Sequence, residues 1–191
     1  GGYRMGGRTF HCWKKEGHGT VDVVKALQAS CDVFYYMIGN RIDIDVIYKY
    51  ATMFGMGQRS GIILPRETSG LIPNKEWKKK RTGVEWQRGE TLSCVIGQSF
   101  VNVTPLQLAM FYSTLANEGK LYRPHVVKEV FSNTGQVLKK YDPEIINEFK
   151  ISKKTIDLVK EALYDVVNAP GGTALSQKGV GIQMSGKTGT A

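Results

Sequence analysis

The stretch Gly186-Lys187-Thr188-Gly189-Thr190-Ala191 closes the chain. It places an ammonium group, a hydroxyl and backbone without side chains within a few residues. This combination suits the binding of a carboxylate beside an acyl group under attack. A Lys-Thr-Gly triplet also occurs in ordinary solvated turns, so its meaning depends on the motifs that precede it.

Several short motifs precede this stretch in a fixed order. They are Gly17-His18-Gly19, Ser30-Cys31-Asp32, Gly97-Gln98-Ser99, Val103-Thr104-Pro105-Leu106-Gln107 and Gly171-Gly172-Thr173-Ala174. Together with the closing Lys-Thr-Gly they resemble the penicillin-binding protein transpeptidase domain, and most closely the class B enzymes of cell-wall elongation. The resemblance runs along nearly all of the chain, and the order of the motifs carries it.

The resemblance implies a fold and an activity. The fold is α/β in the broad sense (α+β), similar to the serine β-lactamases, with a mainly helical lobe against an antiparallel sheet. The activity is peptidoglycan D,D-transpeptidation, in which a serine attacks a D-Ala-D-Ala stem peptide and a neighbouring stem resolves the acyl-enzyme. β-Lactams would acylate the same serine. A serine β-lactamase and a penicillin-sensing or scaffold domain of the same fold remain alternatives.

The motif that starts this chemistry, Ser-x-x-Lys, is missing from the sequence, because no serine is followed three residues later by a lysine. Residues 1–191 are therefore expected to be the central part of one transpeptidase domain. The Ser-x-x-Lys segment would lie upstream, and further strands and a helix would follow. At 191 residues and 41% hydrophobic composition, the chain is long enough for a sizeable core.

The resemblance also assigns catalytic roles. Ser30 matches the serine of the Ser-x-Asn motif, whose hydroxyl passes a proton between the catalytic lysine and the leaving amine. Asp32 stands where many relatives have Asn, and its carboxylate would hold an ammonium partner firmly. From position alone, Ser30 and Asp32 could equally be helix caps.

The closing stretch would bind substrate. Lys187 and Thr188 are expected to hold the terminal carboxylate of the stem peptide or of a β-lactam, and Gly189 to leave room for the ligand. Thr190 would supply a backbone N–H to the oxyanion and its hydroxyl to the carboxylate. The plain alternative for the four residues is an edge strand.

The chain has three cysteines, Cys12, Cys31 and Cys94. Cys12, His18 and Cys31 offer thiolate and imidazole ligands of the kind that zinc prefers, although free thiols or a Cys12–Cys31 disulfide fit the sequence as well. Some class B elongation enzymes have a zinc site beside the catalytic centre. There the resemblance places His18 and Cys31 as ligands and Cys12 in the position of an Asp, with a further Asp upstream. Cys94 is expected in the core and His11 at the surface.

The net charge of +9 is densest at Lys78-Lys79-Lys80-Arg81. We expect a solvated loop there, flanked by Trp77 and Trp86, which either pack over the loop or contact glycan. No aromatic platform accompanies the basic run, so nucleic acid is not an expected partner. The resemblance implies a membrane glycosyltransferase and other elongation proteins as partners. It also implies a place on the periplasmic face of the inner membrane, with an anchor upstream.

Local signals predict the main elements. Thr20 and Asp32 are predicted to cap the first two helices. Because Ser99 stands where the family usually has Gly, the backbone there is expected to be less free to adopt positive φ. The remaining predictions are a helix from Asp43 or Asp45 to Gly55, a helix capped by Thr104 that ends near Gly119, a hairpin of 125–131 with 136–141, a helix over 152–168, and a segment 180–184 that leads to the closing stretch.

Overall fold

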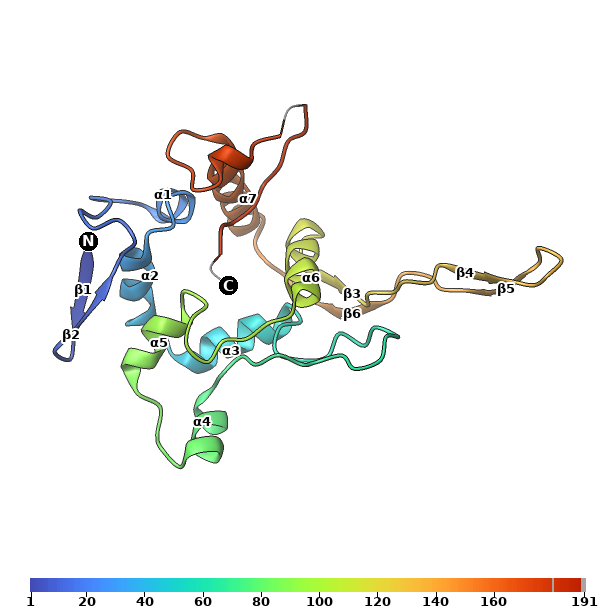
Figure 1. The fold of residues 1–191 in the computed structure, drawn as a ribbon, viewed down its shortest axis with the longest axis horizontal. Helices are drawn as coiled ribbons and strands as arrows, with labels where there is room; N and C mark the ends of the chain where they lie inside the picture. The colour runs from blue at the N-terminus through green and yellow to red at the C-terminus, as the bar shows by residue number, and fades with distance from the viewer. Residues whose placement is uncertain (180, 190–191) are drawn as a thin grey trace. The chain divides into compact units, whose positions relative to one another are not determined.

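The computed structural model describes residues 1–179 and 181–189. The chain divides into two compact units, the first made of residues 1–44, 85–99 and 152–191 and the second of 45–84 and 100–151. Each unit is mixed helix and antiparallel strand (Figure 1). In chain order the elements are β1 (Gly2–Met5), β2 (Arg8–His11), α1 (Val23–Gln28), α2 (Asp32–Gly39), α3 (Ile44–Met53), α4 (Lys75–Thr82), α5 (Arg88–Cys94), α6 (Pro105–Ala116), β3 (Lys120–Tyr122), β4 (Glu129–Phe131), β5 (Val137–Lys140), β6 (Ile145–Glu148), α7 (Lys153–Asn168) and the 3-10 turn η1 (Leu175–Gln177).

The first unit opens with the hairpin of β1 and β2, which sequence reasoning missed. Gly6 and Gly7 form its turn with φ of 56° and 78°, a pair of positive φ values that glycine adopts at little cost. The Gly-Gly pair between alternating residues was the available signal. Phe10 of this hairpin packs with Tyr36 of α2 and Leu92 of α5 in one hydrophobic cluster.

Helices α1 and α7 pack side by side in the same unit (Figure 1). The prediction for α7 is confirmed, because Ser152 caps it by accepting a hydrogen bond from the Thr155 N–H. The predicted cap of α1 is wrong. Asp22, not Thr20, caps this helix through the N–H of Lys25, because a carboxylate directly before the first helical residue reaches that N–H.

The second unit is organised around α6. Thr104 caps α6 and Pro105 is its first residue, as predicted, and Gln107 completes a reciprocal capping box. Gln107 is almost fully buried, and its amide donates to the carbonyls of Gln58 and Ser69 at 2.6 and 2.8 Å. The Thr-Pro-Leu-Gln motif therefore joins the start of α6 to the loop of residues 58–71.

The remaining predicted elements of this unit also occur. Helix α3 lies within its predicted range and is followed by Gly55 at φ 88°. Strands β4 and β5 form the predicted hairpin, although β4 begins only at Glu129 because the pairing with β5 starts there. Figure 1 shows this hairpin extending beyond the sheet of β3 and β6. Directly after β3 and directly before β6, Arg123 and Glu144 form an ion pair, with 2.7 Å between Nε and the carboxylate oxygen.

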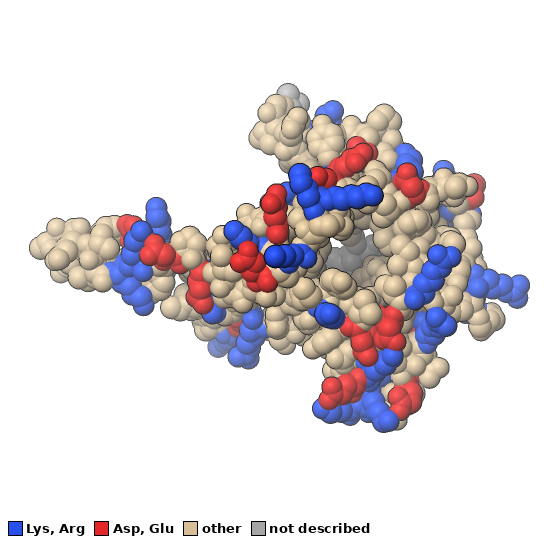
Figure 2. Space-filling model, turned by 180° about the vertical axis from the view of Figure 1, so that it is seen from behind, with Lys and Arg blue, Asp and Glu red and all other residues tan. Residues whose placement is uncertain are grey.

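The basic run was predicted as a loop, and this prediction is wrong. It lies in α4, which Asn74 caps and Gly83 ends in the left-handed conformation at φ 72°. Lys78 is buried, and Trp77 packs against Phe100 with ring centroids 5.2 Å apart. On the face in Figure 2, acidic and basic side chains are interspersed. Within α4, Glu76 and Lys80 form an ion pair at 2.6 Å.

Ser99 corrects a further expectation. Its φ is 66°, so it adopts the left-handed conformation although it is not glycine. Ser99 directly follows the turn after α5, in which the Gly97 N–H donates to the Cys94 carbonyl and the Gln98 N–H donates to the Ser93 carbonyl. A left-handed conformation costs a non-glycine residue about 1–2 kcal/mol but is not forbidden. None of the helices in the described part of the chain is long and apolar enough to cross a membrane.

Candidate active site

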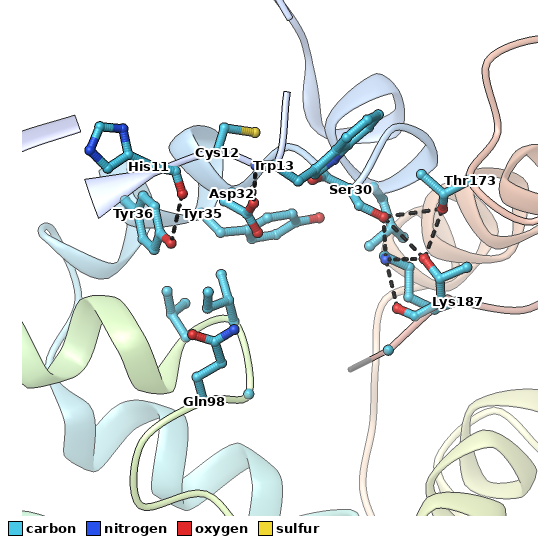
Figure 3. A pocket seen from close by; sticks show the side chains of 16 residues that line it. His11, Cys12, Trp13, Ser30, Asp32, Tyr35, Tyr36, Gln98, Thr173 and Lys187 are labelled. Atoms are coloured by element: carbon cyan, nitrogen blue, oxygen red, sulfur yellow. Dashed lines mark hydrogen bonds between the residues drawn. The ribbon is translucent and has the colours of Figure 1, made fainter. Parts of the chain in front are cut away.

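A cavity of about 900 Å³ lies in the first unit and gathers most of the predicted site residues (Figure 3). Ser30, Asp32, Lys187, Thr188 and Gly189 all line it, although they are up to 159 positions apart in the sequence. Thr190 lies outside the described residues. The cavity is further lined by His11, Cys12, Trp13, Leu27, Tyr35, Tyr36, Val95, Ile96, Gly97, Gln98 and Thr173.

Ser30 sits in the sharp turn between α1 and α2. Its φ is 50°, a left-handed conformation that costs a non-glycine residue about 1–2 kcal/mol. The neighbouring backbone holds this turn, since the N–H of Cys31 donates to the Ala26 carbonyl at 2.9 Å. The Trp13 indole N–H adds bonds to the carbonyls of Ala29 and Ser30, at 3.1 and 2.9 Å. The turn thereby points the Ser30 hydroxyl into the cavity (Figure 3).

Asp32 is the first residue of α2 and not its cap, which is Cys31. Its carboxylate accepts a hydrogen bond from the Trp13 backbone N–H at 3.1 Å. A carboxylate in the first turn of a helix is also stabilised by the helix dipole. Asp32 therefore places fixed negative charge at the cavity wall.

Lys187 reaches Ser30 directly. Its ammonium nitrogen lies 2.5 Å from Ser30 Oγ, 3.0 Å from the Thr188 carbonyl oxygen and 3.3 Å from Thr188 Oγ1. Burial lowers the pKa of Lys187, and the Asp32 carboxylate offsets part of that effect. The positive charge is thus held in a partly desolvated place, where its attraction for an anionic ligand is strengthened.

The closing stretch is anchored to α7 through the Gly186 N–H, which donates to the Leu163 carbonyl at 3.0 Å. The edge strand that was the plain alternative for this stretch is not formed by residues 182–189. A strand requires a hydrogen-bonded neighbour, and no assigned strand of the described residues pairs with this segment.

Sequence reasoning assigned no role to Thr173, yet its hydroxyl belongs to the site. Thr173 Oγ1 lies 3.1 Å from Ser30 Oγ and 2.9 Å from Thr188 Oγ1, and the latter two atoms are 3.3 Å apart (Figure 3). The signal was the Gly-Gly-Thr-Ala motif itself. Its two glycines make the turn that ends near Ser30.

A second cluster lies next to this site. It consists of Cys12, His18 and Cys31, each of which offers one possible metal-ligand atom. These three atoms all lie within 4.8 Å of one another. Cys12 Sγ is 3.5 Å from His18 Nδ1, while His18 Nε2 is buried and has no hydrogen-bond partner. Cys12 and Cys31 are not joined in a disulfide. Cys94 is buried and His11 is exposed, both as predicted.

These three residues suit a soft or borderline cation. Burial, followed by the Lys14 ammonium, lowers the pKa of His18, and burial raises that of the Cys31 thiol. The lowered pKa favours the neutral imidazole, which is the form that binds a metal, whereas the buried Cys31 thiol needs an adjacent positive charge to become a thiolate. A zinc ion would supply that charge and a partner for the unpaired imidazole nitrogen.

Trp13 connects the two groups of residues. It follows Cys12 in the chain, its ring meets the His18 ring edge-on with centroids 5.3 Å apart, and its N–H groups bond to the Ser30 turn and Asp32. The cluster and the turn therefore share one rigid aromatic side chain.

The family of the chain follows from comparison with known proteins. The family model described as "Penicillin binding protein transpeptidase domain" matches residues 1–191. The chain therefore belongs to the penicillin-binding protein transpeptidase family.

Within this family, similar proteins are enzymes named peptidoglycan D,D-transpeptidase MrdA. The one from Acinetobacter baumannii is 38% identical over 95% of this chain, and the one from Haemophilus influenzae is 36% identical over 96%. The chain spans only 27% and 28% of their lengths. The structure of penicillin-binding protein 2 from Helicobacter pylori matches with a TM-score of 0.86 at 32% identity, over 98% of this chain and 34% of that one. The predicted fold is thereby confirmed.

Proposed function

We propose that the protein acts as a peptidoglycan D,D-transpeptidase of cell-wall elongation and that β-lactams acylate it. The observation that supports this most directly is the contact of Lys187 Nζ with Ser30 Oγ at 2.5 Å, at the wall of a cavity that also contains Asp32. A proton-carrying hydroxyl and a carboxylate-binding ammonium are thus held together, as attack on a D-Ala-D-Ala peptide requires.

The roles of the residues follow from their contacts. In this proposal the nucleophilic serine and its lysine lie in a Ser-x-x-Lys segment outside residues 1–191. That serine bonds to the penultimate D-Ala carbonyl carbon, and the bond from this carbon to the terminal D-Ala nitrogen breaks. The serine's proton reaches the leaving nitrogen through the lysine and Ser30, while Asp32 holds the lysine ammonium. Lys187 and Thr188 bind the terminal carboxylate, and the Thr190 N–H donates to the oxyanion.

We also propose that Cys12, His18 and Cys31 hold one structural zinc ion, with an upstream Asp as fourth ligand. The unpaired His18 Nε2 and the two buried thiols support this. When bound, zinc would cross-link the hairpin segment to the start of α2 and perform no part of the acyl transfer, since a four-ligand site leaves no open position. Through Trp13 this cross-link would steady the turn that carries Ser30.

The location and partners are proposed from the relatives. One similar solved structure is a complex between penicillin-binding protein 2 and MreC from Helicobacter pylori. Another similar structure belongs to a peptidoglycan synthase complex. We infer a place on the periplasmic face of the inner membrane, with a membrane glycosyltransferase and elongation-complex proteins as partners.

Labelling of the full-length protein with a fluorescent penicillin tests the activity. A long-lived covalent adduct together with cross-linking of stem peptides would support the proposal. Catalytic hydrolysis of the penicillin would identify a β-lactamase instead, and an adduct without cross-linking would identify a sensor. No labelling at all would indicate a scaffold.

A further inference from the structure

The turn after α7 delivers Thr173 to the site by a specific backbone construction. Gly171 has φ 84°. A Cβ on Gly172 would lie 2.4 Å from the carbonyl oxygens of Asp165 and Val166, so only glycine fits against the end of α7. The next N–H, that of Thr173, then donates to the Gln28 carbonyl at the end of α1, at 3.2 Å.

A second contact fixes this turn to the helix before Ser30. The Gln28 side chain is buried, and its amide donates to the Pro170 carbonyl at 2.9 Å. Gln28, which makes both of these hydrogen bonds, lies two residues before Ser30 in the sequence. Thr173 is therefore held from the same helix end that leads into the Ser30 turn, and its position relative to Ser30 is rigidly defined.

The contacts of the three hydroxyls show what Thr173 can do. An ammonium group only donates, so Ser30 Oγ accepts from Lys187 at 2.5 Å. Thr173 Oγ1 lies 3.1 Å from Ser30 Oγ and 2.9 Å from Thr188 Oγ1, and in each pair either hydroxyl can be the donor. Because a hydroxyl both donates and accepts, Thr173 can bond to both neighbours at once.

Thr188 Oγ1 lies within hydrogen-bond distance of Thr173 Oγ1, Ser30 Oγ and the Lys187 ammonium, and Thr188 also lines the cavity. Without the Thr173 hydroxyl, the contact of Ser30 with Thr188 at 3.3 Å would remain, which is the longest of the three hydroxyl contacts. The two hydroxyls would then be less firmly oriented.

We propose that Thr173 is a positioning residue whose hydroxyl orients those of Ser30 and Thr188. It holds Ser30 Oγ within reach of Lys187 and Thr188 at the wall of the cavity in which the substrate carboxylate would bind. This inference rests on the proposed transpeptidase function and adds a residue to it.

The test compares Thr173→Val, which keeps the shape but loses the hydroxyl, with Thr173→Ser, which keeps the hydroxyl but loses the methyl group. The second-order rate constant of acylation by a carboxylate-bearing penicillin is measured on the full-length protein. We expect Thr173→Val to lower it about tenfold to a hundredfold, as for loss of one proton-transfer or anion-stabilising contact. Thr173→Ser should stay within about threefold of wild type, and both variants should melt close to it.

Equal rates for Thr173→Val and wild type would overturn the role of Thr173 and leave the transpeptidase proposal intact. The opposite order, with Ser worse than Val, would mean that the methyl group acts by packing and would also overturn it. A wild-type protein that is never acylated would remove both proposals. A crystal structure of Thr173→Val with unchanged Ser30 and Thr188 rotamers and an unchanged Lys187 contact would count against the orienting role as well.

Discussion

Replacing Gln107 with Met should destabilise the second unit by roughly 2–4 kcal/mol. Gln107 is 1% exposed, donates to the carbonyls of Gln58 and Ser69, and accepts from the Thr104 N–H at 3.1 Å. A methionine side chain fills similar space but leaves these three backbone groups without a partner. Each unpartnered group lowers the free energy of unfolding by about 1 kcal/mol or more, so the three together lower it by about 3 kcal/mol or more. Burial of the apolar methionine side chain offsets about 1 kcal/mol of this loss.

Calorimetry of the full-length protein would measure the effect. For a domain of this size each kcal/mol lowers Tm by about 2–4 °C, so we expect a drop of roughly 5–15 °C. Gln136→Met makes the same chemical change at an exposed position of the same unit and should stay within about 0.5 kcal/mol. Gln107→Glu keeps the acceptor but loses both donors, and should also destabilise at neutral pH. If Gln107→Met melted like Gln136→Met, the two hydrogen bonds to Gln58 and Ser69 would not be what holds loop 58–71.

Three further outcomes are expected in the full-length protein. Lys187→Ala should lower the acylation rate by about a hundredfold or more while Tm changes little, because the ammonium acts electrostatically; an unchanged labelling rate would refute its role. Protein purified without chelator should hold about one zinc per chain by metal analysis. The variants His18→Ala and Cys31→Ser should each lose the zinc ion and have a lower Tm. A wild-type protein that holds no metal and has an oxidised Cys31 would refute the zinc site. Burial raises the pKa of Glu67, but hydrogen bonds from the Ser60 hydroxyl and amide outweigh it, so the net pKa is lowered. The stability this contributes is present above the unfolded pKa and is lost as the pH falls from about 5 toward 3; Glu67→Gln should show a shallower loss of Tm over that range, and parallel curves would contradict the assignment.

The sequence alone determined the elements whose signals are local. Ser152 before an apolar 3.6-residue repeat fixed the start of α7, and Thr104-Pro105 fixed that of α6, because a cap acts on N–H groups within three residues of itself. The ordered motifs also singled out Ser30, Asp32, Lys187 and the Cys12–His18–Cys31 group as candidates, because the proposed chemistry requires these side-chain types in whatever fold presents them.

Tertiary structure decided where the local signals were ambiguous or silent. The basic run was expected as a solvated loop and became α4, which Asn74 and Gly83 cap and in which the Lys78 side chain is buried. Ser99 adopts positive φ directly after the hydrogen-bonded turn of Gly97 and Gln98, which its residue type alone did not predict.

The contact of Thr173 with Ser30 joins residues 143 positions apart, and that of Lys187 with Ser30 joins residues 157 apart. Such contacts depend on the packing of α1 against α7 and on the Gly-Gly turn beyond α7. Hydrophobic burial drives that packing without regard to separation along the chain, so no local pattern could have placed the three hydroxyls together.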